Sequence, residues 1–310
     1  MILKEPIVFS VSTYLYLKES ICKHGNLEHG IIERKVFPDG ESYHRIKSDV
    51  VDKDIILIGG STCDSDTLET FDLACAMVKY GARSLTIVMP YYGYSTMEKS
   101  IKEGEVVTAK TRARLFSSIP LSPRGNRIIL FDLHCEGITY YFEGSIRPFH
   151  LYLTPLILEA VKEITNGKDF VLASTDAGRA KWIQSMANEL GVRPSFVFKK
   201  RIDGSKTEVT SVNAQVENKH VVIYDDMIRT GSSLINSARA YLESGAIKVS
   251  AIATHGLFPN NSLEELQNTK LFEKIICTDT HPRAVLLEKD FKNFLEIKSI
   301  SKTIYNYLII

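Results

Sequence analysis

Short apolar segments rich in β-branched residues recur along the whole chain, and they constrain the fold more than any other feature. Continuous apolar runs of about four to eight residues are typical of strands that are buried on both faces. Such strands belong to parallel sheets that are covered by helices on both sides. The segments that fit this description are Pro6–Phe9, Asp54–Ile58, Ser84–Met89, Arg127–Phe131, Phe170–Ala173, Ser195–Phe198, Val221–Tyr224, Val249–Ala253 and Ile275–Cys277.

Amphipathic segments of helical length lie between many of these predicted strands. The two clearest are Thr67–Tyr80 and Ser233–Ser244, in which apolar residues recur three and four positions apart. Gly245 directly follows the second segment, as is typical of the residue that ends a helix. Strands that alternate with helices predict βαβ units, and therefore an α/β fold with mainly parallel sheets.

Two parts of the chain share one layout. The order strand, small-residue turn, helix, glycine, strand occurs over residues 54–89 and again over residues 220–253. The repetition predicts two related α/β halves. We expect one domain over residues 1–148 and a second over residues 149–310, with the last residues packing back on the first domain.

Composition and charge exclude several classes of partner. Lys and Arg number 38 against 37 Asp and Glu, so the net charge of +1 predicts no binding to nucleic acid or to a membrane surface. No apolar run approaches the roughly 20 residues of a spanning helix, and residues 1–10 lack the features of a signal peptide. The five cysteines are scattered and form no C-x-x-C pair, which favours reduced thiols in a cytoplasmic protein.

The clearest candidate site is the segment VVIYDDMIRTGSS, residues 221–233. A buried strand leads to Asp225 and Asp226, and ligands of parallel sheets bind beyond the carboxyl ends of strands. The two acids could accept hydrogen bonds from the vicinal hydroxyls of a sugar. Backbone N–H groups at the start of a helix hold phosphate, so the following turn predicts a ribose-phosphate site. The alternative is a plain helix N-cap, because Asp and Ser are common caps. The turn residues concerned are Thr230, Gly231, Ser232 and Ser233.

This segment resembles the ribose-phosphate loop of the type I phosphoribosyltransferase fold. Further motifs, which occur in family order, narrow the resemblance to the ribose-phosphate pyrophosphokinases and cover about residues 6 to 285. These motifs are Phe37–Glu41 (FPDGE), Pro90–Tyr94 (PYYGY), Thr108–Lys110 (TAK), Asp132–His134 (DLH), Ser174–Gly178 (STDAG), Lys199–Arg201 (KKR), Ala253–Phe258 (ATHGLF) and Thr278–Pro282 (TDTHP).

The resemblance implies two tandem type I phosphoribosyltransferase-like domains. It also implies an enzyme that transfers the β,γ-diphosphate of ATP to the anomeric hydroxyl of ribose 5-phosphate, with Mg²⁺ as the cofactor. The products are phosphoribosyl pyrophosphate, which supplies nucleotide biosynthesis, and AMP. Family members assemble into homo-oligomers with ATP near a subunit contact, so a homo-oligomer is expected here.

The same resemblance implies roles for single residues. Lys199 and Arg201 match the cations that stabilise the transferring group, and His134 and Asp176 match the Mg²⁺–nucleotide site. By itself, KKR would indicate only a solvated basic strand end, and a lone His is most often a hydrogen-bonded structural residue. In the FPDGE motif, the residues that match the adenine-binding loop are Phe37, Asp39 and Glu41.

Two of the places where the chain departs from the family concern the proposed substrates. After PYYGY the family continues A-R-Q-D-R-K, where this chain has S-T-M-E-K-S. Thr96 replaces a nucleotide-binding Arg, Met97 replaces a Gln near the adenine, and Lys99 lacks the bidentate geometry of Arg. Arg229 stands where the family has an acid beside the 5′-phosphate pocket. It is either a binding group for a second phosphate or neutral drift on an exposed helical turn.

Three functions follow from these observations. The first is synthesis of phosphoribosyl pyrophosphate, and the second is the same transfer to a larger ribosyl acceptor such as ADP-ribose, in NAD-related metabolism. The third is a catalytically weak regulatory subunit of a synthetase assembly, which the changes at Thr96 and Met97 favour. The retained Lys199 and Arg201 oppose the third. A plain phosphoribosyltransferase would leave the N-terminal half without a role.

Overall fold

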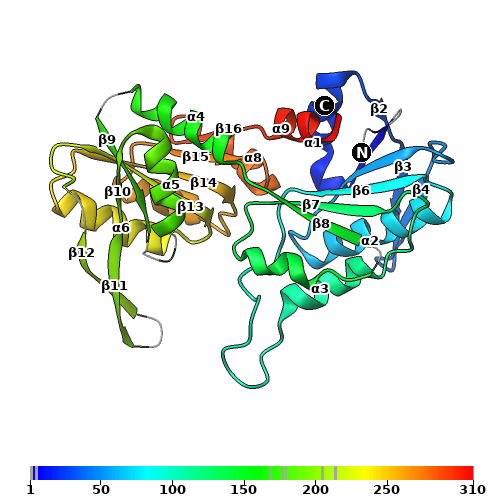
Figure 1. The fold of residues 1–310 in the computed structure, drawn as a ribbon, viewed down its shortest axis with the longest axis horizontal. Helices are drawn as coiled ribbons and strands as arrows, with labels where there is room; N and C mark the ends of the chain where they lie inside the picture. The colour runs from blue at the N-terminus through cyan, green and yellow to red at the C-terminus, as the bar shows by residue number, and fades with distance from the viewer. Residues whose placement is uncertain are drawn as a thin grey trace. The chain divides into compact units, whose positions relative to one another are not determined.

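The computed structural model divides into two compact units (Figure 1). Unit 1 runs to Tyr152 and takes up the chain again from Ile300, and unit 2 is Leu153–Ser299. Side chains of residues 198–211 are outside the described part of the structure. The residues that the structure describes are 3, 6–144, 146–167, 169–175, 178, 180–203, 206–212 and 215–309.

Unit 1 is built on a parallel sheet of six strands in the order β2-β1-β5-β6-β7-β8. Every residue of β5 and β6 is buried, as continuous apolar runs require. The strands are β1 (Ile7–Ser10), β2 (Glu28–His29), β5 (Asp54–Ile58), β6 (Ser84–Met89), β7 (Asn126–Phe131) and β8 (Ile146–Leu151). The helices are α1 (Leu15–Gly25), α2 (Asp64–Lys79), α3 (Thr108–Ser117) and α9 (Ser301–Ile309), with the short helices η1 (Ser12–Tyr14) and η2 (Glu136–Tyr141).

The C-terminal helix α9 packs on α1 within unit 1 (Figure 1). Ser20 Oγ donates to Ser301 Oγ at 2.8 Å, and His24 Nε2 lies 3.0 Å from the same hydroxyl. Ile304 and Leu308 of α9 are buried. The last described residues of the chain therefore belong to the core of the unit in which the chain begins.

Unit 2 has a second parallel sheet of six strands, in the order β10-β9-β13-β14-β15-β16. Its strands are β9 (Phe170–Ser174), β10 (Arg193–Ser195), β13 (His220–Ile228), β14 (Lys248–Gly256), β15 (Ile275–Thr278) and β16 (Leu295–Lys298). Its helices are α4 (Thr154–Thr165), α5 (Ala180–Leu190), α6 (Ser232–Glu243), α7 (Ser262–Asn268) and α8 (Pro282–Glu288).

Alternate residues of β13 build two separate cores in unit 2. Val221 and Ile223 belong to a cluster with Tyr241 of α6. Val222 and Tyr224 belong to a second cluster with Ile183 of α5. Because side chains alternate across a strand, the two clusters lie on opposite faces of the sheet, which is therefore covered on both sides.

The two sheets have the same strand order, and each unit inserts one antiparallel hairpin after its second strand along the chain. The hairpin of unit 1 pairs β3 (Ile32–Val36) with β4 (Ser42–Ile46), and that of unit 2 pairs β11 (Val197–Asp203) with β12 (Lys206–Val212). The α/β class with two parallel sheets, predicted from the apolar runs, is confirmed.

Two local predictions were wrong. The predicted strand Ser195–Phe198 is divided between β10, which ends at Ser195, and β11, which begins at Val197 and pairs in the hairpin. The strand Val221–Tyr224 does not stop before the two acids, because β13 continues to Ile228. Within the described residues, none of the helices has the length and apolarity that crossing a membrane requires.

Candidate functional site

The two acids of unit 2 lie within β13, at its carboxyl end. Asp226 is buried, with 2% of its surface exposed, and Asp225 is half-buried. Both backbone positions continue the sheet next to β14, since the pairing with that strand extends to Ile228 and Gly256. The acids therefore stand within a strand of the sheet rather than in an open loop.

The carboxylate of Asp225 is held by two donors. Thr175 Oγ1 donates to Asp225 Oδ2 at 2.9 Å, and the Asp226 N–H donates to Asp225 Oδ1 at 2.9 Å. The end of β9 is itself held by α6, because Ser237 Oγ donates to the Thr175 carbonyl at 3.2 Å. The sequence analysis missed Thr175. The signal for it was its place directly after a predicted strand, next to the strand that carries the acids.

A glycine-led turn connects β13 to α6. Gly231 has φ +79° and is the N-terminal flanking residue of α6, a conformation that favours glycine. A Cβ at this position would lie 2.7 Å from Leu266 Cδ2, so packing also requires glycine. No side chain caps the helix, and its first turn contains no acid. The N–H groups of this turn are therefore available to an anion.

The side chains around this turn are small and exposed. Thr230, Ser232 and Ser233 are exposed, and the hydroxyls of Thr230 and Ser232 lie 3.1 Å apart. Arg229, also exposed, immediately precedes them. The structure thus brings together on one edge of the sheet all the residues of unit 2 that were predicted to bind a ribose phosphate.

The predicted catalytic cations lie on β11. Lys199 pairs with Val209 of β12, and Arg201 pairs with Thr207. The pairing shifts in register between Phe198 and Lys199. The side chains of Lys199 and Arg201 are outside the described residues, as is Asp176, and their roles stay predictions.

In unit 1 the FPDGE motif forms the turn of the β3–β4 hairpin. The Phe37 N–H donates to the Glu41 carbonyl at 2.8 Å, and the Glu41 N–H donates to Asp39 Oδ1 at 3.1 Å. Phe37, Asp39 and Glu41 are exposed, and the Phe37 ring meets Tyr43 edge to face at 6.1 Å. Figure 1 draws this hairpin at the labels β3 and β4. The role of the FPDGE turn in binding adenine stays a prediction from the family resemblance.

The PYYGY motif makes a tightly held loop after β6. Gly93 donates its N–H to Ser61 Oγ at 2.7 Å, and a Cβ at Gly93 would collide with the Ser61 carbonyl. Tyr94 has φ +59°, and its hydroxyl donates to Asp64 Oδ1 at 2.8 Å. Arg112 Nη2 binds the same oxygen at 2.7 Å. These contacts fix the backbone that leads into the altered segment.

The altered segment after this loop is exposed. Thr96, Met97 and Lys99 all lie at the surface, and Met97 has 43% of its surface exposed. The Met97 N–H donates to the Tyr94 carbonyl at 2.8 Å, and Lys99 Nζ lies 3.4 Å from Glu98 Oε1. The three predicted nucleotide contacts are thus on one short surface segment that could meet a ligand.

His134 is exposed at the carboxyl end of β7, beside a constrained turn. Asp132 is fully buried with φ +36°, and the Leu133 N–H donates to His150 Nε2 at 3.0 Å. Burial lowers the pKa of His150, which keeps Nε2 an acceptor. The sequence analysis missed this residue of β8. Its contact holds the turn that presents His134.

The ATHGLF and TDTHP motifs meet in a buried cluster in unit 2. His255 of β14 is 2% exposed and forms an isolated bridge with Asp279, and its Nδ1 lies 2.9 Å from Thr280 Oγ1. Burial lowers the pKa of His281 to about 3, with the neighbouring His255 as a second cause. These residues join β14 to β15, and their contacts are those of structural residues.

Among the residues that the structure describes, no group of three His, Cys, Asp or Glu side chains forms a metal site. Mg²⁺ commonly uses one or two carboxylates together with substrate phosphates and water. The carboxylate of Asp225, at the carboxyl end of β13, is of the ligand type that this kind of site uses. The exposed His134 offers a ring nitrogen, whereas Mg²⁺ prefers oxygen ligands. The ring therefore suits a hydrogen bond to a nucleotide phosphate better than it suits the metal ion.

Comparisons with known proteins cover both units. Residues 6–119 match the model of the N-terminal domain of ribose phosphate pyrophosphokinase, and residues 173–304 match the phosphoribosyl synthetase-associated domain. The ribose-phosphate pyrophosphokinase of Mycoplasma genitalium is 32% identical over 289 residues, which are 90% of this chain and 84% of that protein. That of Thermotoga maritima is 30% identical over 286 residues, 91% of this chain and 89% of the relative.

A solved structure has the same fold. The crystal structure of phosphoribosylpyrophosphate synthetase from Mycobacterium smegmatis superimposes with a TM-score of 0.85 and covers 98% of both chains, at 24% sequence identity. The type I phosphoribosyltransferase-like architecture expected from the motifs is confirmed by this likeness.

Proposed function

Because this chain belongs to the ribose-phosphate pyrophosphokinase family, we propose that it makes phosphoribosyl pyrophosphate and AMP from ribose 5-phosphate and ATP. The family predicted from the motifs is confirmed, and with it an ATP-dependent diphosphotransferase. The observation that carries the proposal is the β13–α6 connection, where an acid pair precedes an uncapped helix N-terminus.

In the proposal, unit 2 binds ribose 5-phosphate. The 5′-phosphate accepts hydrogen bonds from the first N–H groups of α6 and from the hydroxyls of Thr230, Ser232 and Ser233. The ribose hydroxyls donate to Asp225, whose position is fixed by Thr175. The buried Asp226 supports the negative potential that attracts the diol and keeps the strand end rigid.

Unit 1 binds ATP in the proposal. The exposed segment that contains Thr96, Met97 and Lys99 meets the nucleotide, together with His134. The FPDGE turn is assigned to the adenine of a nucleotide held by a neighbouring subunit. His134 and Asp176 are assigned to the Mg²⁺–nucleotide site, where bound Mg²⁺ would neutralise part of the charge of the ATP phosphates.

The proposed reaction exchanges one phosphorus–oxygen bond for another. The anomeric hydroxyl oxygen attacks the β-phosphorus of ATP, and the bond from that phosphorus to the bridging oxygen of the α-phosphate breaks. The hydroxyl proton passes to solvent, and AMP leaves with the bridging oxygen. Positioning and charge neutralisation dominate such transfers, and Lys199 and Arg201 are assigned to the charge that develops on the diphosphate.

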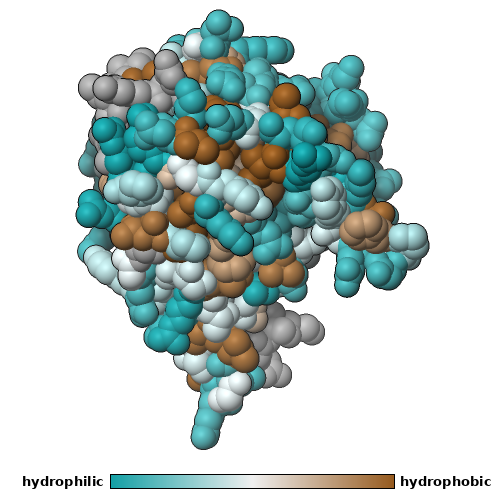
Figure 2. All heavy atoms as spheres, turned by 90° about the vertical axis from the view of Figure 1, so that its right-hand side faces the viewer, coloured by the Kyte–Doolittle hydropathy of each residue, from teal (hydrophilic) through white to brown (hydrophobic). Residues whose placement is uncertain are grey.

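In the proposal the protein acts in the cytoplasm as a homo-oligomer, and its substrates are small molecules only. The face of unit 1 with the β3–β4 hairpin carries exposed apolar side chains among polar ones (Figure 2). Ile31, Val36, Phe37, Val51 and Leu68 are exposed in the elements of this region. An apolar face around the FPDGE turn supports assembly with further copies of the chain.

The test is incubation with Mg-ATP and ribose 5-phosphate, with products separated by chromatography. Equal amounts of AMP and phosphoribosyl pyrophosphate are expected. ADP in place of AMP would indicate transfer of a single phosphoryl group and contradict the proposal. An absence of any acceptor-dependent product would favour the regulatory subunit.

A second candidate acceptor follows from Arg229. The side chain is exposed immediately before the phosphate-binding turn and offers five donors that suit a second phosphate, as in ADP-ribose. A charge-assisted hydrogen bond contributes roughly 1.5–3 kcal/mol. Arg229→Asp should therefore lower kcat/KM for ADP-ribose about ten- to a hundredfold and leave ribose 5-phosphate unaffected. Equal changes for both acceptors would remove Arg229 from substrate selection.

A further inference from the structure

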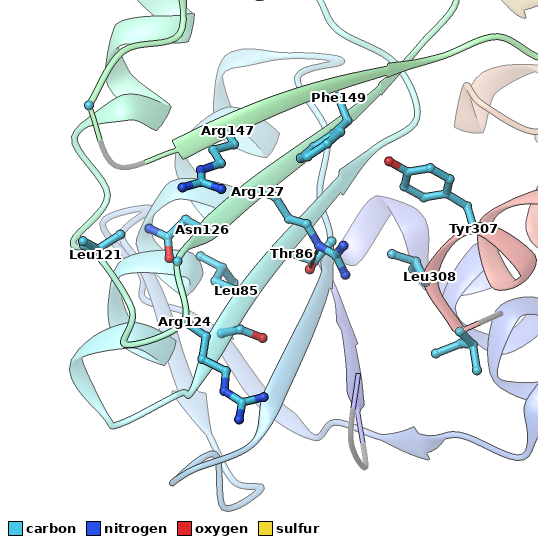
Figure 3. Close-up of a pocket in the computed structure, with 14 residues that line it drawn as sticks. Leu85, Thr86, Leu121, Arg124, Asn126, Arg127, Arg147, Phe149, Tyr307 and Leu308 are labelled. Carbon is cyan, nitrogen blue, oxygen red and sulfur yellow. Dashed lines mark hydrogen bonds between the residues drawn. The ribbon is translucent and has the colours of Figure 1, made fainter. Parts of the chain in front are cut away.

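Unit 1 contains a cavity of about 640 Å³ at the amino ends of β6, β7 and β8 (Figure 3). The proposed nucleotide residues Thr96, Met97 and Lys99 follow the carboxyl end of β6, and His134 follows that of β7, so this cavity lies at the opposite edge of the sheet. Its walls come from these three strands, from the loop before β7 and from the last residues of α9. The proposed reaction assigns no role to any residue of these walls.

Two arginines of this cavity occupy paired positions on neighbouring strands. Arg127 of β7 is the register partner of Arg147 of β8, and Thr86 of β6 is the register partner of Arg127. Paired residues on neighbouring strands project from the same face of the sheet. Like charges at such positions are destabilising unless an opposite charge lies between them. Arg124 adds a third guanidinium from the loop before β7.

Arg127 is half-buried, and one of its donor atoms has no hydrogen-bond partner among the described residues. Its Nε donates to Thr86 Oγ1 at 2.7 Å, and Figure 3 shows the guanidinium beside Thr86, on the side that faces Tyr307 and Leu308. Its Nη2 is buried, and no atom of the described residues accepts a hydrogen bond from it. Burial lowers the pKa of this guanidinium below its ordinary value. A buried cationic donor of this kind costs stability unless an acceptor reaches it.

The described lining of this cavity contains no acid, since none of those residues is Asp or Glu. An acid near Arg127 is Asp54, and Asp54 is already bound by Arg83 Nη2 at 2.8 Å and by Ser84 Oγ at 2.6 Å. Arg124 and Arg147 are exposed to solvent, so the unmet hydrogen bond of Arg127 Nη2 is the feature of this lining that points to an anionic ligand.

The other lining residues of the cavity are apolar or fix the loop before β7. Phe149, Tyr307 and Leu308 face the cavity near Arg127 (Figure 3). Asn126 fixes the loop that carries Arg124, because its Nδ2 donates to the Pro120 carbonyl at 2.8 Å. The polar and apolar surfaces together suit a ligand with an anionic group and an apolar body.

We propose that this cavity is a second ligand site of the chain, which binds the phosphate group of a small molecule between Arg124, Arg127 and Arg147 and packs the apolar body of that molecule against Phe149 and Tyr307. Arginine forks match the oxygens of phosphate in geometry and charge. The bound group completes the hydrogen bonds of Arg127 Nη2 and removes the repulsion between Arg127 and Arg147.

The test is calorimetric titration of the full chain with phenyl phosphate and with inorganic phosphate. Arg127→Gln and Arg147→Gln should each weaken phenyl phosphate binding about ten- to a hundredfold, which is the usual effect of losing one charge-assisted hydrogen bond. Arg114→Gln removes an exposed arginine from α3 and is the matched control, for which wild-type affinity is expected. Binding of phosphate at other sites of the chain is expected to be the same in the wild type and in all three variants, so it does not affect the comparison.

Unchanged affinity in Arg127→Gln and Arg147→Gln would overturn the site. Equal affinity for phenyl phosphate and inorganic phosphate would overturn the assignment of the apolar wall. Thermal unfolding gives an independent measurement for variants that bind weakly. Phosphate should raise the Tm of the wild type more than that of Arg127→Gln, and the same increase in both would contradict the proposal.

Discussion

The helices α2 and α6 occupy the same place in their two sheets, yet only α6 is open to an anion. Each follows the third strand of its unit in sheet order, β5 for α2 and β13 for α6. The first turn of α2 carries Asp64 and Asp66, whereas the first turn of α6 contains no acid. The positive end of the α2 dipole is thus compensated by the protein itself.

A shared topology thus supplies a possible anion site in each unit, and a few side chains decide whether an anion can bind there. In unit 1, Asp66 contacts the Thr62 hydroxyl, and burial raises the pKa of Asp66. Asp64 is bound by Tyr94 and Arg112. In unit 2 the equivalent turn has Gly231 and exposed hydroxyls in place of these acids. The account therefore places the ribose phosphate in unit 2 alone.

The largest expected effect concerns the two hairpins. Lys199→Ala and Arg201→Ala should each lower kcat by about 10²–10³, with little change in KM, because their proposed contacts strengthen as charge develops on the diphosphate. The matched control in the hairpin of unit 1 is Lys35→Ala, which removes a cation paired with Glu33 at 2.7 Å. Steady-state kinetics with near-normal kcat in both β11 variants would remove β11 from the chemistry.

The next effect concerns the glycine of the α6 turn. Gly231→Ala introduces a Cβ at φ +79° and 2.7 Å from Leu266, and we expect it to destabilise the protein by about 2 kcal/mol or more. The KM for ribose 5-phosphate should rise with it. Gly191→Ala is the control, since φ is +68° there and a Cβ would meet no atom within 4 Å. If chemical denaturation shows equal losses in both variants, the contact with Leu266 does not hold the turn.

A smaller effect on substrate binding is expected for Asp225 of unit 2, and none for Asp64 of unit 1. Asp225→Asn should raise the KM for ribose 5-phosphate about ten- to a hundredfold, because one charge-assisted acceptor of the ribose hydroxyls is lost. Asn can still accept from the Asp226 N–H, so the Tm should change little. Asp64→Asn in α2 should leave this KM unchanged. An unchanged KM in Asp225→Asn together with a large fall in Tm would indicate a purely structural acid.

A further difference between the units is the dependence of stability on pH, which we expect to originate mainly in unit 2. Burial lowers the pKa of His220 to about 4 and that of His281 to about 3. In the unfolded chain a histidine has a pKa of about 6.5, so below this pH the unfolded chain binds protons that the folded protein does not bind. The free energy of unfolding therefore falls as the pH is lowered from about 6.5 to 4. Each such group contributes a slope of up to about 1.4 kcal/mol per pH unit.

His220→Gln tests this origin. The variant removes a titrating ring that lies 2.9 Å from Ser250 Oγ, and Gln retains a hydrogen-bonding group. Urea denaturation at a series of pH values should give a shallower slope between pH 6 and 4.5 than the wild type. A slope that stays the same would assign the acid sensitivity to other groups.

Central strands were predictable because a buried strand leaves a continuous apolar run. Asp54–Ile58 and Ser84–Met89 have the bounds that the sequence predicted. Edge strands and hairpins are partly solvated and therefore polar, as in Glu28–His29, and the sequence analysis missed them. The division of Ser195–Phe198 between two sheets could not be read from local residues, since partner strands decide it.

The candidate site was predictable where it is contiguous in sequence. Residues 225–233 stand together because one strand, one turn and one helix carry them. Thr175 and His150 were missed because they act through contacts with residues 50 and 17 positions away. The roles of Lys199, Arg201 and Asp176 remain predictions from family resemblance.

The most direct test of the comparison is a crystal structure of the full chain with ribose 5-phosphate. The account predicts the phosphate of the ligand at the first turn of α6, in contact with the N–H groups after Gly231, and ribose hydroxyls on Asp225. It predicts no phosphate at the first turn of α2. A ligand bound at α2, or bound away from the β13–α6 turn, would contradict the account.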